Sequence, residues 1–111
     1  MPKKHPFEIG DHVAAFWVDD FGQYQWHLAI VEKIVSSETV QLSYLKRMDS
    51  AGRDWVFPEE AEIQQTSMEQ ILDVQVAVAV RYYCSTKICC RVNNETVNNL
   101  NLKMENAVKS V

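Results

Sequence analysis

The sequence predicts a mostly β domain: a small barrel of about five strands, followed by a β-hairpin and a terminal α-helix. Three observations support this prediction. Short runs of strand-forming residues with period-two alternation fill the first half of the chain, and Gly, Asp and Ser turn signals separate them. A chain of 111 residues fits one domain with one modest core. Near the end, Val97, Leu100 and Met104 have helical spacing.

The barrel is expected over residues 7–72. Alternating segments predict strands over residues 12–17, 26–34, 40–45 and 54–57. Turn signals separate these strands at residues 19–22, 36–38 and 47–53. Pro58 ends the last of the strands, and the acidic Glu59, Glu60 and Glu62 that follow are interpreted as a solvated turn. Capping-box patterns within residues 66–70 predict one short helical turn.

Residues 73–111 are expected to pack on the barrel in one compact unit, and residues 1–6 form an extended lead-in. Alternation over Val74–Val80 predicts a long strand whose valine face must be covered. We expect the terminal helix to cover this face, with homodimerisation through the same strand as the alternative. A strand over 87–92 would complete a hairpin, and Asn93 or Asn94 would cap the helix.

Composition narrows the class of protein. The net charge of -4 argues against a dedicated nucleic-acid binder, which needs a clustered basic face. No apolar run approaches the roughly 20 residues that span a bilayer, and the first residues do not form a secretory signal. Three closely spaced cysteines, Cys84, Cys89 and Cys90, favour reduced thiols and an intracellular location.

A family resemblance rests on three segments: residues 9–17, 26–31 and 40–44. Each is an alternating strand that begins or ends in an aromatic residue, and a glycine opens the first. Together they resemble a Tudor-like domain of the Royal superfamily, whose fold is an SH3-like barrel. The resemblance covers about residues 7–72, a little over half of the chain.

The resemblance implies a binding function. In Tudor domains that read methylation, aromatic residues at these strand ends form a cage, and Trp17, Trp26 and Tyr44 match its positions. The implied partner is a protein segment, such as a methylated basic, histone-like tail of chromatin in the nucleus. Aromatic faces attract such a cation by about 0.5–2 kcal/mol per contact. Asp19 and Asp20 are expected at the rim of the cage, and Tyr24, Phe21 or Trp55 would supply a further wall.

Two other functions remain open. Lys46, Arg47 and Arg53 lie close to Trp55 in sequence, a combination that suits nucleic acid through phosphate contacts and base stacking. The same aromatic residues could instead only fill the core of a structural or oligomerisation module, because a small barrel must bury large side chains.

Catalysis and cofactors are not expected. His12 and His27 fall on adjacent predicted strands, but a metal site needs three or four ligands with defined spacing, and none is evident. Nothing marks Cys89 or Cys90 as reactive. A chain with three glycines has no glycine-rich phosphate loop. The sequence therefore predicts a non-enzymatic binding module without a metal or cofactor.

Overall fold

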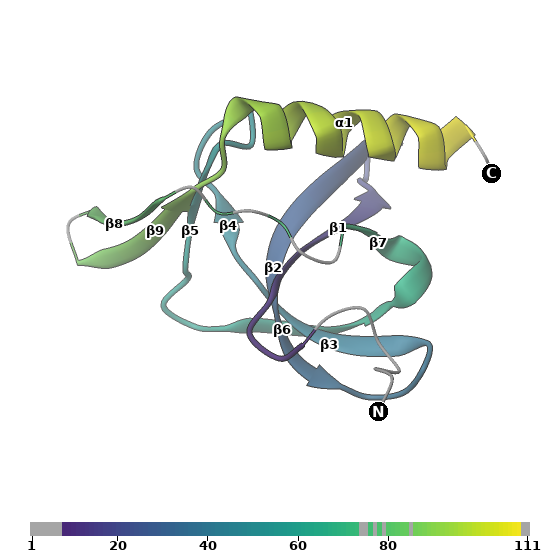
Figure 1. The fold of residues 1–111 in the computed structure, drawn as a ribbon, viewed down its shortest axis with the longest axis horizontal. Coiled ribbons are helices and arrows are strands. Elements are labelled where there is room, and N and C mark those ends of the chain that lie inside the picture. Colours follow the sequence, from purple (N-terminus) through teal and green to yellow (C-terminus); the bar gives the residue numbers. More distant parts are fainter. Residues whose placement is uncertain (1–7, 74–75, 77, 79, 85, 110–111) are drawn as a thin grey trace.

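The computed structural model describes residues 8–73, 76, 78, 80–84 and 86–109. It contains two antiparallel sheets and one C-terminal helix, α1 (Asn94–Lys109), as Figure 1 shows. The helix lies along one side of the sheets, and the β8–β9 hairpin points away from the body of the molecule. The predicted mostly β class is therefore confirmed.

The first sheet has five strands in the order β6-β3-β2-β1-β7. Their bounds are β1 His12–Val18, β2 Tyr24–Ile34, β3 Thr39–Tyr44, β6 Glu62–Ser67 and β7 Ile71–Asp73. The final strand β7 returns to pair with β1, but β6 and β7 remain the two edges of the sheet. The strands therefore do not close into a complete barrel.

The second sheet has four strands in the order β4-β5-β9-β8. Their bounds are β4 Lys46–Arg47, β5 Asp54–Val56, β8 Val80–Cys84 and β9 Lys87–Arg91. The predicted C-terminal hairpin is present as β8 and β9. The short strand before Pro58 is β5, and it pairs with β9 of this hairpin. This pairing joins the C-terminal part of the chain to the segment between β3 and β6.

Both faces of the β1–β2 pair are buried, which explains why these strands alternate less cleanly than β3. One face carries Val13 and Ala15 and packs against β3 in the first core cluster, together with Val40, Leu42 and Tyr44. The opposite face carries Trp26 and Leu28 and packs in the second core cluster against Trp55, Val97 and Leu100. Each strand therefore joins two cores.

The terminal helix packs as predicted. Asn93 caps it, because its Oδ1 accepts a 2.8 Å hydrogen bond from the backbone N–H of Thr96. Val97 and Leu100 are buried and Met104 is partly buried against the same cluster. Within the described ranges, no helix has the length and apolar character that a bilayer crossing requires.

The predicted long strand over Val74–Val80 is wrong for the residues that the structure describes. Strand β7 ends at Asp73 and β8 begins at Val80, while Val76 and Val78 lie in neither strand. Both valines pack into the second core cluster with α1, so the helix covers them. Residues 74, 75, 77 and 79 lie outside the described part of the chain. Side-chain alternation was mistaken here for sheet pairing.

The acidic segment was also misassigned in part. Glu62 begins β6, which pairs with β3 along its whole length, whereas Glu59 and Glu60 lie in a bend. The predicted helical turn is a 3-10 turn, η1 (Met68–Gln70), in which the Ser67 hydroxyl accepts from the backbone N–H of Glu69. Exposed polar residues on an edge strand gave no alternating signal to detect.

Candidate functional site

The three residues that match the cage positions do not meet around one hollow. Trp17 and Tyr44 belong to the first core cluster, whereas Trp26 lies on the opposite face of the sheet in the second. Trp26 is 1% exposed and Tyr44 is 4% exposed. The expected geometry of an open cage is therefore corrected: even and odd positions of β1 and β2 face opposite sides.

A different ring trio forms at the end of the first core cluster. The Trp17 ring stacks on His27 at a centroid distance of 4.0 Å and meets Tyr44 edge-on at 5.3 Å. Stacked rings at this separation leave no space for a guest between them. Burial, aided by the charge of Arg47, lowers the pKa of His27 to about 4, so this imidazole is neutral near pH 7. Tyr44 shares a 2.7 Å hydrogen bond with the Thr66 hydroxyl.

The expected acidic rim lies in the β1–β2 turn. Oδ1 of Asp19 accepts hydrogen bonds from the backbone N–H groups of Phe21 and Gln23, both at 2.9 Å. Asp19 therefore shapes the turn, while Asp20 is exposed beside it. The turn presents Phe21 with 90% of its surface exposed, and Tyr24 is 40% exposed at the start of β2. Phe21 and Tyr24 are the accessible rings at this end of the sheet.

Arg47 lies over two indoles that also contact each other, with a centroid distance of 5.3 Å between Trp26 and Trp55. Its Cζ lies 5.0 Å from the ring centroid of Trp26 and 4.8 Å from that of Trp55, and its Nη2 donates a 2.6 Å hydrogen bond to the Trp26 carbonyl oxygen. Trp55 is fully buried, and its indole N–H donates to the Gly52 carbonyl oxygen at 2.8 Å. Trp55 therefore cannot stack on a base. It does lie next to Arg47, as their closeness in the sequence suggests.

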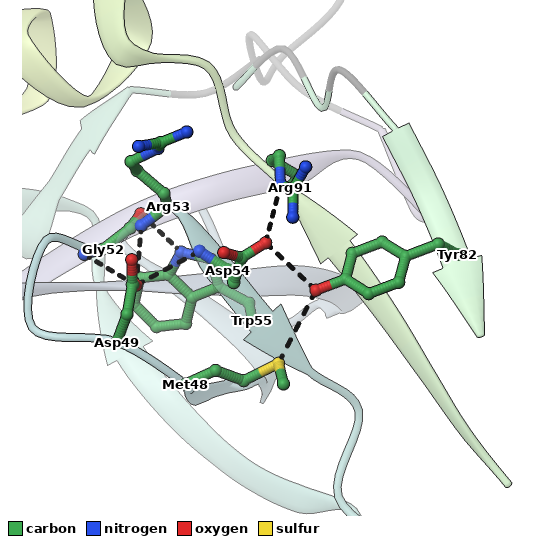
Figure 2. A network of polar contacts seen from close by, with 8 residues as sticks. All are labelled: Met48, Asp49, Gly52, Arg53, Asp54, Trp55, Tyr82 and Arg91. Atoms are coloured by element: carbon green, nitrogen blue, oxygen red, sulfur yellow. Dashed lines mark hydrogen bonds and ion pairs between the residues drawn. The ribbon is translucent and has the colours of Figure 1, made fainter. Parts of the chain in front are cut away.

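The turn between β4 and β5 is fixed by a carboxylate. Oδ1 of Asp49 accepts from the backbone N–H groups of Gly52, Arg53 and Asp54, at 3.1, 3.0 and 3.2 Å (Figure 2). Gly52 adopts a φ of 79°, and a Cβ there would come within 2.7 Å of Arg47 Nη1. The turn thus needs both the aspartate and the glycine to hold Arg47 and Arg53 in place.

A second polar network fixes the far side of β5. Arg91 Nε donates to Asp54 Oδ1 at 2.8 Å, and the Tyr82 hydroxyl donates to the same oxygen at 3.0 Å (Figure 2). These bonds lower the pKa of Asp54, with the Arg91 bond as the largest cause. In Figure 2 the guanidinium of Arg53 points away from this network. Arg53 is therefore directed toward a different surface from Asp54.

That surface is a cavity of about 400 Å³ between the start of β2, the β4–β5 turn and α1. We call it the helix cleft. Polar side chains of Arg47, Arg53, Asn94, Asn98 and Asn101 line it. Tyr24, Gln25 and Trp26 supply the β2 side, and Val97 and Met104 supply apolar surface from the helix.

Three asparagines line the helix cleft from α1 at the spacing i, i+4 and i+7, which places them on one helix face. They are Asn94, Asn98 and Asn101. Oδ1 of Asn101 accepts a 2.7 Å hydrogen bond from the indole N–H of Trp26, so its amide nitrogen is left to donate elsewhere. The side chains of Asn94 and Asn98 are exposed. The row therefore offers both hydrogen-bond donors and acceptors to the cavity.

The predicted basic residues separate. Arg47 and Arg53 both line the helix cleft, whereas Lys46 lies at another cavity and forms an ion pair with Glu62 at 3.8 Å. The asparagine row was not predicted, because asparagine is a poor helix former and Asn94 was interpreted only as a candidate helix cap. Their spacing, at 94, 98 and 101, is the signal that could have found it.

Neither metal binding nor thiol chemistry is indicated in the described part of the chain. No group of three or more His, Cys, Asp or Glu side chains there could hold a metal ion. Cys89 and Cys90 are buried, and burial raises the pKa of Cys90 to about 11, which keeps its thiol protonated. Comparison of the chain with protein-family models, curated proteins and solved structures gives no match.

Proposed function

We propose that this chain is a non-enzymatic binding module that recognises an extended protein segment in the helix cleft. The observation that supports this most directly is the row of three asparagines along one wall of a cavity of about 400 Å³. Amide side chains, two hydroxyls and two guanidiniums line this cavity, and no Asp, Glu, His or Cys is among the described residues that line it. Such a lining binds ligands but has no evident means to transform them.

An asparagine side chain suits the main chain of a peptide. Its amide carries an acceptor oxygen and a donor NH2, which match a peptide N–H and C=O. Asn94 and Asn98 are separated by about 6 Å along the helix axis, given a rise of about 1.5 Å per residue. An extended chain repeats its same-side groups about every 6.6 Å. The spacing from Asn94 to Asn98 therefore nearly matches the spacing between same-side groups of an extended peptide.

The topology of the first sheet supports an SH3-like barrel as the framework of this module. The strand order is β6-β3-β2-β1-β7, a 3-10 turn precedes the last strand, and that strand returns to pair with β1. In this proposal the second sheet and α1 are additions to the barrel, with β4 and β5 inserted between β3 and β6. The Tudor-like resemblance belongs to the same proposal.

The binding site in this proposal differs from the cage implied by the resemblance. Trp26 faces the other side of the sheet, and the Trp17–His27 stack is closed. Tyr24 and Trp26 from the expected set line the new site, but Trp26 is buried and Tyr24 is exposed. A methylated basic tail would also have to approach two guanidiniums, which repel a cation. The geometry therefore favours a protein segment over that particular ligand.

Nucleic acid is the second candidate, because Arg47 and Arg53 lie at one cavity. Two features weigh against it. Trp55 is inaccessible to a base, and Lys46 belongs to a different surface with Glu62. A net charge of -4 also opposes a polyanion at long range.

Selection from a pool of random 12-residue peptides tests the proposal. We compare peptides retained by the wild-type chain, by Asn98→Ala and by Asn99→Ala. Asn98 lines the cleft, whereas Asn99 is its exposed neighbour on the same helix and is not among the lining residues. Both substitutions raise helix propensity equally, so they form a matched pair.

The proposal predicts that Asn98→Ala loses the selected peptides and that Asn99→Ala keeps them. Equal retention by the two variants would place the site elsewhere. Absence of any retained peptide, together with a dimer by light scattering, would instead favour an oligomerisation module.

A further inference from the structure

The helix cleft is a positively charged hollow on an acidic protein. Its charged lining residues, within the described part of the chain, are Arg47 and Arg53, and no Asp or Glu lines it. The whole chain carries a net charge of -4. By contrast, the cavity near the β5–β6 connection is lined by Glu59, Glu60 and Glu62 along with two lysines. The cleft is therefore locally positive, unlike the cavity near the β5–β6 connection.

Neither cleft arginine forms an ion pair with a carboxylate of the described residues, although two aspartates are nearby. Asp49 uses Oδ1 to accept from three backbone N–H groups of the turn. Asp54 is held by Arg91 and Tyr82 on the other side of β5. The local carboxylates therefore make their hydrogen bonds within the turn and the sheet, and they act on the two cleft guanidiniums through their charge without contacting them as ion pairs.

Arg47 is held in place before any ligand arrives. It is half-buried, packs over two indoles and donates to the Trp26 carbonyl oxygen. Burial lowers the pKa of its guanidinium, and the charge of nearby Asp49 offsets part of this effect. Arg53 is exposed at the mouth and can move to meet a ligand. This pairing of a fixed and a mobile guanidinium suits an oxyanion.

We infer that the protein segment bound in the helix cleft presents a carboxylate, which Arg53 binds directly beside the fixed charge of Arg47. This inference rests on the proposed function, because the asparagine row would hold the main chain next to that carboxylate. The carboxylate comes either from an Asp or Glu side chain or from the C-terminus of the segment. A nucleic acid is less suited, since the lining offers two cations and a single exposed aromatic residue, Tyr24.

Three peptide pools test the inference. The first contains random 12-residue peptides with amidated C-termini. The second is identical except that Asn and Gln replace every Asp and Glu. The third is the second pool with free C-termini, which isolates the terminal carboxylate. Retention is measured for the wild-type chain, for Arg53→Gln, and for Lys46→Gln as a control whose lysine lies outside the cleft.

We expect the wild-type chain to retain the first or the third pool at least about fivefold more than the second. Arg53→Gln should lose this preference, while Arg53→Lys and Lys46→Gln keep part or all of it. Circular dichroism confirms that each variant is folded. The first pool identifies a side-chain carboxylate, and the third identifies a terminal one.

Equal retention of the three pools, with binding still dependent on Asn98, would overturn the carboxylate inference and leave the proposed function standing. No retention of any pool would overturn the proposed function itself. Tighter, salt-sensitive binding of a single-stranded 12-nucleotide DNA that is lost in Arg53→Gln would overturn the inference in favour of nucleic acid.

Discussion

The indole N–H of Trp26 donates a 2.7 Å hydrogen bond to Oδ1 of Asn101, and this bond joins β2 to α1 across 75 positions of sequence. Trp26 is almost completely buried, so its N–H has little access to water. The bond therefore has two roles. It satisfies a buried donor, and it orients the last asparagine of the row that lines the helix cleft.

Loss of this bond is expected to destabilise the fold. Asn101→Ala leaves the Trp26 N–H without a partner, which costs about 1–3 kcal/mol of unfolding free energy. Asn99→Ala is the matched control, because it makes the same gain in helix propensity at an exposed position. Urea unfolding of the two variants measures the difference. Equal unfolding free energies would show that the Trp26–Asn101 bond contributes nothing.

Gly52 and Gly22 share a left-handed backbone but differ in their surroundings. Their φ angles are 79° and 80°, so an added side chain strains both by about 1–2 kcal/mol. At Gly52 the Cβ would also approach Arg47 Nη1 at 2.7 Å and two Trp26 ring atoms at 3.1 and 3.3 Å, whereas Gly22 has nothing within 4 Å.

Gly52→Ala should therefore be less stable than Gly22→Ala by about 1–3 kcal/mol, the usual cost of overpacking. Arg47 would have to leave its place over the indoles, or the packed Trp26 ring would have to shift. Thermal and urea unfolding of both variants check this. A Gly52→Ala chain as stable as Gly22→Ala would mean that Arg47 is loosely held.

Protonation of His27 should weaken the fold in mild acid. Its pKa is lowered from 6.5 to about 4 by burial and by the charge of Arg47. The unfolded chain therefore binds more protons between these values, and the unfolding free energy falls as the pH drops from about 6.5 toward 4. The pKa of His12 is lowered as well, so it acts in the same direction.

The contribution of each histidine can be separated by substitution. His27→Gln should flatten the pH dependence of the urea midpoint between pH 6.5 and 4 more than His12→Gln does. Asp54, whose pKa is lowered from 3.8, loses its contribution at lower pH and does not obscure this range. An unchanged slope in His27→Gln would contradict the assignment.

Asp49 is expected to control the β4–β5 turn. Asp49→Ala removes the acceptor of three backbone N–H groups and should lower the unfolding free energy by about 1–2 kcal/mol. Asp49→Asn keeps an acceptor oxygen and should recover part of the loss. Asp20→Ala, in the exposed β1–β2 turn, serves as the control. The turn would need another explanation if Asp49→Ala and Asp20→Ala behaved alike.

Much of the local structure could be predicted from the sequence. Apolar periodicity predicts strands β1, β2, β3 and β9 and helix α1, and the cap at Asn93 marks where the helix begins. The strand prediction around Val76 and Val78 was wrong because burial under α1 and pairing in a sheet favour the same alternation of apolar residues. Strand β6 was missed because its residues are mostly exposed and polar.

The site was harder to predict than the fold. Alternation predicts that Trp17 and Trp26 face opposite sides of the β1–β2 pair, since their register partners are Gln25 and Phe16. The positions of aromatic residues at strand ends do not by themselves reveal which face of the sheet each ring occupies. The helix cleft depends on α1 lying beside residues 47–53, and no local pattern reports such a distant contact. The charges of Arg47 and Arg53 identify them as candidates, but their separation from Lys46 depends on the tertiary fold.

The most direct test is to map a selected peptide onto the chain by NMR chemical-shift perturbation. The account predicts that the largest shifts occur in the side-chain signals of Asn98 and Arg53 and in the indole N–H of Trp26, which all belong to the helix cleft. Signals of Trp17 and His27 should change little. Shifts concentrated at Trp17, His27 and Tyr44, with the cleft unchanged, would contradict the account and place the site at the opposite face of the first sheet.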